Sequence, residues 1–322
     1  MIQSNNTMGK KTLHDASVAK YNEFYTRIED IENELRYYKP FFRGKTVLCN
    51  CDDPRVSNFF KYFTLNFETL GLKKVIATCY KNCEPDLFSQ NESEHSIYIV
   101  YEGDKNGNRV PDPSEMEVLP LKGDGDFRSP ECIELLQEAD VVCTNPPFSL
   151  FRQYIAQLFQ YNKKFLIIGN TNAATYKEIF PYIQSNQLWV GVTNYNVGMY
   201  FVLPDNAEKY HHIENGKKIG RVSTPCWWTN IENKRRAEEF IPTRKYKPEE
   251  YSKYDNYDAI DCCPYTEIPI DYDGVIGVPI TFLGHYNPKQ FEIVGFRKGN
   301  DGKDLTIKGE DAYFRMLIRK VK

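Results

Sequence analysis

Apolar residues in the first 205 positions alternate between short continuous runs and stretches with helical spacing. The runs at residues 46–50, 74–80, 139–144 and 164–170 are typical of buried strands. Helical spacing occurs at residues 28–38, 56–67, 130–138, 150–159 and 175–186. Because strands and helices alternate in this way, the sequence predicts an α/β fold with a mostly parallel sheet and helices on both faces.

Several residues mark where these elements should begin and end. Pro40 should end the first helix, Asp53 and Pro54 should cap and begin the second, and Gly71 should close it. The alternating residues 96–118 predict a β-hairpin inserted into the series. Two further strands are expected at residues 188–192 and 199–203.

The pattern changes after residue 205. Turn dipeptides such as Asn215-Gly216 and Asp273-Gly274 separate short β-like runs at residues 277–283 and 291–296. A last strand-like piece at residues 313–320 could return to the core. We therefore expect two parts, residues 1–205 and a β-rich region at residues 206–322.

Composition limits the class of protein. The chain has 322 residues with 41% apolar content, enough for a substantial core. Its start lacks an apolar signal segment, and no apolar run approaches the roughly 18 residues of a membrane span, so we expect a cytoplasmic protein without a membrane partner. The 9 cysteines form no Cys-x-x-Cys pair, and we predict core thiols and no metal site.

Charge is unevenly distributed, although the net charge is only −3. Residues 216–247 carry nine basic and three acidic side chains, and residues 248–273 carry eight acids and one lysine. This alternation has two interpretations, an ordinary solvated surface or a local patch that contacts phosphates.

The tetrapeptide Asn145-Pro146-Pro147-Phe148 directly follows a predicted buried strand. An amide oxygen and a backbone carbonyl at such a site can each accept one N–H of an exocyclic amino group, which makes its nitrogen a better nucleophile. Proline stiffens the turn, and the aromatic ring can lie on a base taken out of its duplex. The alternative is that Asn-Pro only ends the strand in a tight turn.

Two further segments should reach the same edge of the sheet. Residues 50–53 follow the first strand, and residues 123–127 follow the inserted hairpin. A carboxylate of Asp52 or Asp53 could bind a cationic group or sugar hydroxyls, whereas Asp53 could equally be only a helix cap. Asp126 could accept an amino hydrogen and Phe127 could stack on a planar ligand, unless this segment is a simple Gly-Asp turn.

Long strings in the chain closely resemble the EcoRI-type adenine-specific DNA methyltransferases. They are residues 49–63, 123–129 and 144–151, and the likeness extends from residues 23–26 to residues 279–283. The resemblance implies the Rossmann-like class I methyltransferase fold, with residues 1–205 as the catalytic domain that binds S-adenosylmethionine. It also implies a target-recognition region at residues 206–322 and methylation of adenine N6 in double-stranded DNA by base flipping.

The resemblance also assigns site residues. The catalytic motif is Asn145, Pro146, Pro147 and Phe148, and the cofactor contacts are Phe24, Tyr25, Thr26, Asn50, Cys51, Asp52, Asp53, Asp126 and Phe127. Many methyltransferases carry an acid after the second strand, but Cys79 and Tyr80 stand there, which leaves the partner of the ribose hydroxyls open.

For DNA contacts we expect Trp227, Trp228, Arg235, Arg236, Arg244 and Lys245. One tryptophan could stack on the extruded adenine or pack in the core, and arginine can contact either phosphates or bases. We expect a monomer that associates with the nucleoid through DNA, in a restriction-modification system whose endonuclease acts without a stable complex. The alternatives are the same chemistry on RNA adenine or a protein glutamine amide, or an inactive DNA-binding relative.

Overall fold

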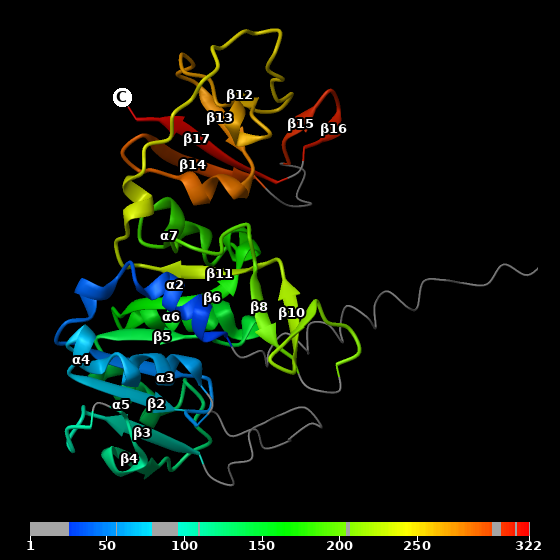
Figure 1. Cartoon of the computed structure of the whole chain (residues 1–322). Helices are drawn as coiled ribbons and strands as arrows, with labels where there is room; N and C mark the ends of the chain where they lie inside the picture. Colours follow the sequence, from blue (N-terminus) through cyan, green and yellow to red (C-terminus); the bar gives the residue numbers. More distant parts are fainter. Residues whose placement is uncertain are drawn as a thin grey trace, which may run out of the picture. The chain divides into compact units, whose positions relative to one another are not determined.

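A computed structural model describes residues 26–55, 57–78, 96–108, 110–203, 207–297, 304–312 and 314–321. The chain divides into two compact units, each built from two segments (Figure 1). The first unit comprises Met1–Gly169 and Met199–Val222, and the second comprises Asn170–Gly198 and Ser223–Lys322. The predicted contacts Phe24 and Tyr25, and the Cys79–Tyr80 position, lie outside the described residues.

The first unit is mixed α/β, and six strands of its sheet have the order β4-β3-β2-β1-β5-β6. Parallel pairing joins β1 to β2 and β5, and β5 to β6. The predicted hairpin is confirmed, because β3 pairs antiparallel with both β2 and β4. The bounds are β1 Thr46–Asn50, β2 Lys74–Thr78, β3 Ile97–Tyr101, β4 Met116–Pro120, β5 Val141–Thr144 and β6 Lys164–Asn170.

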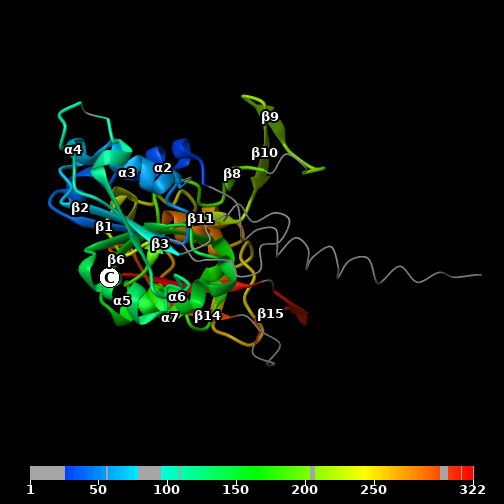
Figure 2. The ribbon, with the colours of Figure 1, turned by 90° about the horizontal axis from the view of Figure 1, so that it is seen from below.

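Helices cover both faces of this sheet. Figure 2 shows α2 and α3 on one side of the strands and α5 and α6 on the other. Apolar stripes such as Phe59 and Phe63 on α3 are buried there. The helices are α2 Ile28–Leu35, α3 Asn58–Leu65, α4 Phe67–Leu70, α5 Pro130–Glu138 and α6 Phe151–Gln160. The predicted helix at residues 130–138 is confirmed in both bounds.

Three helix ends differ in how well they were predicted. Gly71 ends α4 in the left-handed conformation, with φ of 63°, as expected. The predicted cap at Asp53 is wrong, because α3 begins later and the Ser57 hydroxyl accepts the backbone N–H of Phe60. Helix α2 ends at Leu35, and Pro40 lies in a short 3₁₀ helix, Lys39–Phe42.

A second, three-stranded sheet completes the first unit. Its strands β8 Met199–Val202, β9 His212–Glu214 and β10 Lys217–Val222 have the order β8-β10-β9. Both pairings are antiparallel. Asn215 and Gly216 have φ of 49° and 77°, the left-handed backbone that a two-residue hairpin turn requires. The turn predicted at this dipeptide is therefore confirmed.

The second unit is rich in short strands. Its four-stranded sheet has the order β12-β13-β17-β14, with β12 Ala259–Asp261, β13 Val275–Val278, β14 Phe291–Arg297 and β17 Arg315–Lys320. The last strand thus belongs to this sheet. The strand predicted at residues 277–283 is wrong beyond Val278, because Pro279 cannot donate to a ladder and a 3₁₀ helix, Ile280–His285, follows.

The remaining elements of the second unit are smaller. Strand β7, Trp189–Val190, pairs antiparallel with β11, Pro225–Thr229, and β15, Thr306–Ile307, pairs with β16, Glu310–Asp311. The helix predicted at residues 175–186 is reduced to α7, Phe180–Gln184. A 3₁₀ helix at Thr171–Thr175, capped by the Asn170 side chain, occupies the preceding segment. The described residues contain no helix long and apolar enough to cross a membrane.

Candidate active site

The carboxyl ends of two neighbouring strands bring the predicted motifs together. β1 ends at Asn50 and β5 ends at Thr144, directly before the Asn145 motif. The Thr144 hydroxyl donates to the backbone carbonyl of Asn50, and the Tyr154 hydroxyl of α6 donates to the Asn50 side-chain oxygen. Both hydrogen bonds are buried. They fix the segment after β1 beside the segment after β5.

The Asn145-Pro146-Pro147-Phe148 segment connects β5 to α6. Asn145 and Phe148 are half-buried and Pro146 is buried. The Pro147 carbonyl accepts the backbone N–H of Leu150, with 3.0 Å between nitrogen and oxygen, in a 3₁₀ turn that leads directly into α6. The motif is therefore held between a buried strand and a helix and does not lie on a free loop.

The two aspartates after β1 have different surroundings. The buried Asp53 carboxylate accepts the backbone N–H of Arg55 at 2.9 Å and its Nε at 3.0 Å, so it is bound within its own turn. Asp52 is half-buried, and its carboxylate accepts the Ser57 hydroxyl at 3.4 Å. Burial, with a smaller contribution from Asp53, raises the pKa of Asp52 to about 7. Of the two carboxyl groups in this described loop, only Asp53 contacts a cationic side chain, whereas Asp52 contacts a hydroxyl.

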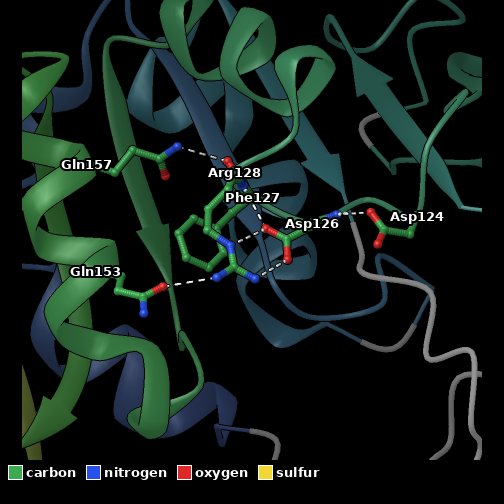
Figure 3. Close-up of polar contacts among 6 residues, drawn as sticks. All are labelled: Asp124, Asp126, Phe127, Arg128, Gln153 and Gln157. Atoms are coloured by element: carbon green, nitrogen blue, oxygen red, sulfur yellow. Dashed lines mark hydrogen bonds and ion pairs between the residues drawn. The ribbon is translucent and has the colours of Figure 1, made fainter.

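A loop between β4 and α5 carries the predicted pair Asp126 and Phe127 (Figure 3). The Asp126 carboxylate accepts the backbone N–H of Arg128 at 2.8 Å, its Nε at 2.9 Å and its Nη2 at 2.6 Å. These contacts with Arg128 lower the pKa of Asp126 and keep it ionised. The Phe127 ring is buried and meets the Tyr154 ring edge to face, with 5.0 Å between centroids.

Helix α6 holds this loop through two glutamines. Gln153 accepts Nη1 of Arg128 at 3.0 Å, and Nε2 of Gln157 donates to the Phe127 carbonyl at 3.0 Å (Figure 3). Because α6 begins directly after the Asn145 motif, one helix links that motif to the Asp126–Phe127 loop. Sequence reasoning did not identify Arg128, Gln153 or Gln157 as part of the site.

A repeated local pattern could have indicated the arginine. Asp53-Pro54-Arg55 and Asp126-Phe127-Arg128 each place an arginine two residues after an aspartate, and each carboxylate accepts both the backbone N–H and the guanidinium of that arginine. The two glutamines gave no comparable signal, because polar residues on a helix usually face solvent.

Thr26 lies at the same edge. Its carbonyl accepts Nδ2 of Asn58, the first residue of α3, at 2.8 Å, and its backbone forms an isolated bridge with Phe201 of β8. The Thr26 hydroxyl is buried and has no hydrogen-bond partner within the described ranges. A buried hydroxyl of this kind is available to a ligand.

The predicted aromatic contacts lie in the second unit. Trp227 and Trp228 of β11 are both 0% exposed, so neither ring is open to a base in this structure. The indole N–H of Trp227 donates to the Asn194 side chain and that of Trp228 to the Asn170 carbonyl, each at 3.3 Å. Core packing, the alternative left open by the sequence, accounts for both positions.

The predicted basic contacts differ in exposure. Arg235 donates through Nε to the Gly284 carbonyl and through Nη1 to the Val192 carbonyl, which ties loops of the second unit together. The Arg236 guanidinium lies 3.7 Å from the centroid of the Trp189 ring. Both arginines line a cavity of about 10 Å³, room for about one water molecule, which is too small for a base.

Arg244 and Lys245 are exposed. Nη1 of Arg244 lies 3.3 Å from a carboxylate oxygen of Glu267, a pair in which both side chains contact solvent. Within the described residues, no group of three or more histidine, cysteine, aspartate or glutamate side chains could hold a metal ion.

Comparisons with known proteins give a consistent result. The family model described as "Adenine-specific methyltransferase EcoRI" matches residues 12–320. The chain is 49% identical to the Type II methyltransferase M.EcoRI of Escherichia coli, over 96% of each chain. It is 38% identical to M.MgeORF184P of Mycoplasma genitalium and 35% identical to M.MpnI of Mycoplasma pneumoniae, both named Type II methyltransferases, over 95% of this chain and 97% of each relative. No solved structure matches. The chain therefore belongs to the EcoRI family of adenine-specific methyltransferases.

Proposed function

We propose that this adenine-specific DNA methyltransferase modifies the N6 nitrogen at a specific duplex site, with Asn145, Pro146, Pro147 and Phe148 as its catalytic motif. Enzymes of the family use S-adenosylmethionine as the methyl donor. The observation that carries the proposal is the pair of hydrogen bonds to Asn50 from Thr144 and Tyr154, which joins the catalytic motif to the cofactor loop.

The proposed mechanism needs no covalent enzyme intermediate. S-adenosylmethionine supplies an electrophilic methyl group. The Asn145 side-chain oxygen and the Pro146 carbonyl each accept one N–H of the adenine amino group, which localises the lone pair on nitrogen. Phe148 stacks on the base after it has left the duplex, and Pro147 restricts the turn that holds both acceptors.

The chemistry of the side chains fits the cofactor. Asp126 is ionised, and a carboxylate has about four acceptor positions, so it can accept an adenine amino hydrogen beyond its bonds to Arg128. The buried Thr26 hydroxyl lacks a hydrogen-bond partner within the described ranges and suits the methionine end, together with Phe24 and Tyr25. Asp52 suits a cationic group or the ribose hydroxyls.

The wider organisation belongs to the same proposal. The parallel order of β2, β1, β5 and β6 with helices on both faces supports the Rossmann-like class I methyltransferase fold. We assign catalysis to residues 1–205 and target recognition to residues 206–322, with Arg244 and Lys245 as candidate DNA contacts. We also propose a cytoplasmic monomer bound to the nucleoid through DNA, with a cognate endonuclease that acts separately.

The test is a methylation assay with the full chain, S-adenosylmethionine and unmethylated genomic DNA. Mass spectrometry of the nucleosides should detect N6-methyladenine. Asn145→Ala should lower turnover by about a hundredfold or more, since it removes one of two acceptors aimed at the reacting nitrogen, and DNA binding should be retained. The control is Asn106→Ala, which removes an exposed amide from the β3–β4 connection.

The outcomes separate the alternatives. Undiminished turnover by Asn145→Ala would overturn the catalytic assignment. Methyl transfer to RNA adenine or to a glutamine peptide, without transfer to DNA, would instead identify a different acceptor. Binding of DNA with no transfer to any of these acceptors would indicate an inactive relative.

A further inference from the structure

We propose that the β9–β10 hairpin of the first unit is a DNA-contacting ribbon, with Lys217 and Arg221 as its phosphate contacts. Figure 2 shows this hairpin extending away from the main sheet of the unit. The inference rests on the proposal that DNA is the methyl acceptor. It adds which element of the chain, and which face of that element, contacts the DNA. Both residues lie in the basic stretch 216–247, for which the sequence left a phosphate-contacting patch open, but neither was among the individually named DNA contacts.

The pairing of the strands defines one face of the hairpin. Lys217 pairs with Glu214, Ile219 with His212 and Val202, and Arg221 with Tyr200, and such partners lie on the same side of a sheet. Side chains two residues apart on one strand also share a face. Lys217, Ile219 and Arg221 therefore point the same way, and the two basic residues at the ends of this row are exposed.

The charge of this segment favours a polyanion. Residues 207–222 contain four lysine or arginine side chains and two glutamates, besides two histidines. One of those glutamates, Glu214, lies 2.9 Å from Nη2 of Arg27, so its charge is already compensated. The ring of Tyr200 on the same face packs against His211 and His212, with centroids 5.4 and 5.8 Å apart. A basic face with aromatic support is typical of nucleic-acid contacts.

Contacts of β8 and of Glu214, the last residue of β9, connect the hairpin to elements around the active site. Thr26 bridges to Phe201 of β8, and its carbonyl accepts Nδ2 of Asn58, where α3 begins after the cofactor loop. The neighbouring Arg27 is the partner of Glu214 on β9. These three contacts lie within one unit. They anchor the hairpin at the edge of the sheet that carries the Asn145 motif.

The shape also suits duplex DNA. The major groove of B-form DNA admits a two-stranded β-ribbon, and the left-handed residues Asn215 and Gly216 give this ribbon a tight turn at its tip. Because its strands are paired before binding, little ordering entropy is lost when it meets the duplex. A ribbon beside the catalytic motif can hold the backbone close to a base that leaves the stack.

The experiment measures binding of the full chain to a fluorescent duplex of random sequence over a series of salt concentrations. The logarithm of the binding constant falls with the logarithm of the salt concentration, and each lost phosphate contact makes this negative slope shallower by about 0.9. The double variant Lys217→Ala/Arg221→Ala should therefore have a slope that is shallower by about 1.8. The matched control is Lys73→Ala/Lys164→Ala, which removes two exposed charges at the amino ends of β2 and β6. Cofactor affinity and thermal unfolding of both variants should equal those of the wild type.

A reduced slope in the hairpin variant alone supports the ribbon. Equal slopes in the wild type and the hairpin variant would overturn the inference and leave DNA as the acceptor. The same reduction in both variants would also overturn it, because the effect would then reflect net charge. If the wild type itself bound no duplex, the proposal that duplex DNA is the acceptor would be overturned. The proposal that the hairpin contacts DNA would then be overturned as well.

Discussion

At the scale of single residues, the two aspartates after β1 differ in their contacts, and only Asp53 is bound within its own turn. Asp53 is bound by Arg55, whereas Asp52 is half-buried without such a partner and has a pKa raised to about 7. A carboxyl group whose pKa lies near neutrality becomes fully ionised when a cationic ligand arrives. This favours Asp52 as the residue that faces the cofactor.

The raised pKa predicts how stability depends on pH. In the unfolded chain the Asp52 carboxyl titrates near its ordinary value of about 3.9, so above that pH the folded protein binds the extra proton. This contribution to stability is full below pH about 4 and is lost as the pH rises through about 7. Between pH 5 and pH 8 the wild type should lose about 2–3 kcal/mol of unfolding free energy that Asp52→Asn does not lose.

Urea unfolding at each pH, without cofactor, checks this difference. Glu117→Gln on β4 is the control, since it removes an exposed carboxylate from the same unit. Its stability should follow that of the wild type at every pH. If the unfolding free energies of the wild type and Asp52→Asn changed in parallel with pH, the Asp52 carboxyl would have the same pKa in the folded and the unfolded chain, and the prediction would be wrong.

The sequence could identify the residues of this site better than their partners. The motif residues Asn145 and Asp126 were predicted from their types and their positions after strands, and their roles remain part of the proposal. The hydrogen-bond partners depend on side-chain rotamers and on which helix turn faces the loop, and neither can be read from one chain. For that reason Asp53 was predicted as a cap, while the nearby Ser57 takes that role.

At the scale of elements, α6 links the proposed catalytic motif to the proposed cofactor loop. Its first turn follows Phe148, and the side chains of Gln153, Tyr154 and Gln157 hold the loop that presents Asp126. The sequence predicted the helix from its apolar residues, which face the sheet. The polar contacts on its flank were not predicted, because amphipathic spacing reports only the buried stripe.

Removal of one of these contacts should weaken the cofactor more than the protein. Gln157→Ala deletes the donor to the Phe127 carbonyl, and a lost hydrogen bond of about 1 kcal/mol corresponds to about fivefold weaker binding of S-adenosylmethionine. Equilibrium dialysis of the full chain measures this affinity. Gln160→Ala, an exposed position on the same helix, should bind the cofactor like the wild type.

Two results would contradict the role of α6. Unchanged cofactor affinity in Gln157→Ala, with a clear loss in Asp126→Ala, would mean that the loop contacts the cofactor. It would also mean that the hydrogen bond from α6 does not position the loop for that contact. Equal losses in Gln157→Ala and Gln160→Ala would point to general weakening of α6.

At the scale of the whole molecule, the sequence predicts a change from an α/β to a β-rich pattern near residue 205, whereas it does not predict which segments each compact unit contains. The strands of the first part were predicted to within a residue or two, because buried strands are nearly continuous apolar runs. The second unit also takes residues 170–198 from before the expected boundary, and the first unit takes residues 199–222, which include the hairpin. These assignments depend on long-range pairing, which hydrophobic spacing does not encode.

This exchange of segments predicts how truncated chains will behave. A chain of residues 206–322 lacks β7, whose Val190 pairs with Trp228, and it lacks Trp189, on which Arg236 lies. It also lacks the Val192 carbonyl that accepts Nη1 of Arg235. Loss of these partners leaves buried polar and aromatic groups without contacts, at a cost of about 1–3 kcal/mol for each polar group, which is large against the stability of a small domain.

We therefore expect residues 206–322 to show no cooperative thermal transition by circular dichroism, whereas residues 170–322, which contain the complete second unit, should unfold cooperatively. The two chains differ by residues 170–205, which supply the 3₁₀ helix Thr171–Thr175, α7, β7, the loop after β7 and strand β8 of the first unit. Equal midpoints for the two chains would mean that these contacts do not stabilise the unit. A cooperative transition in the longer chain alone would show that residues 223–322 do not fold without the segment before the hairpin, because that segment supplies β7, the partner of β11, and the Val192 carbonyl that accepts Arg235.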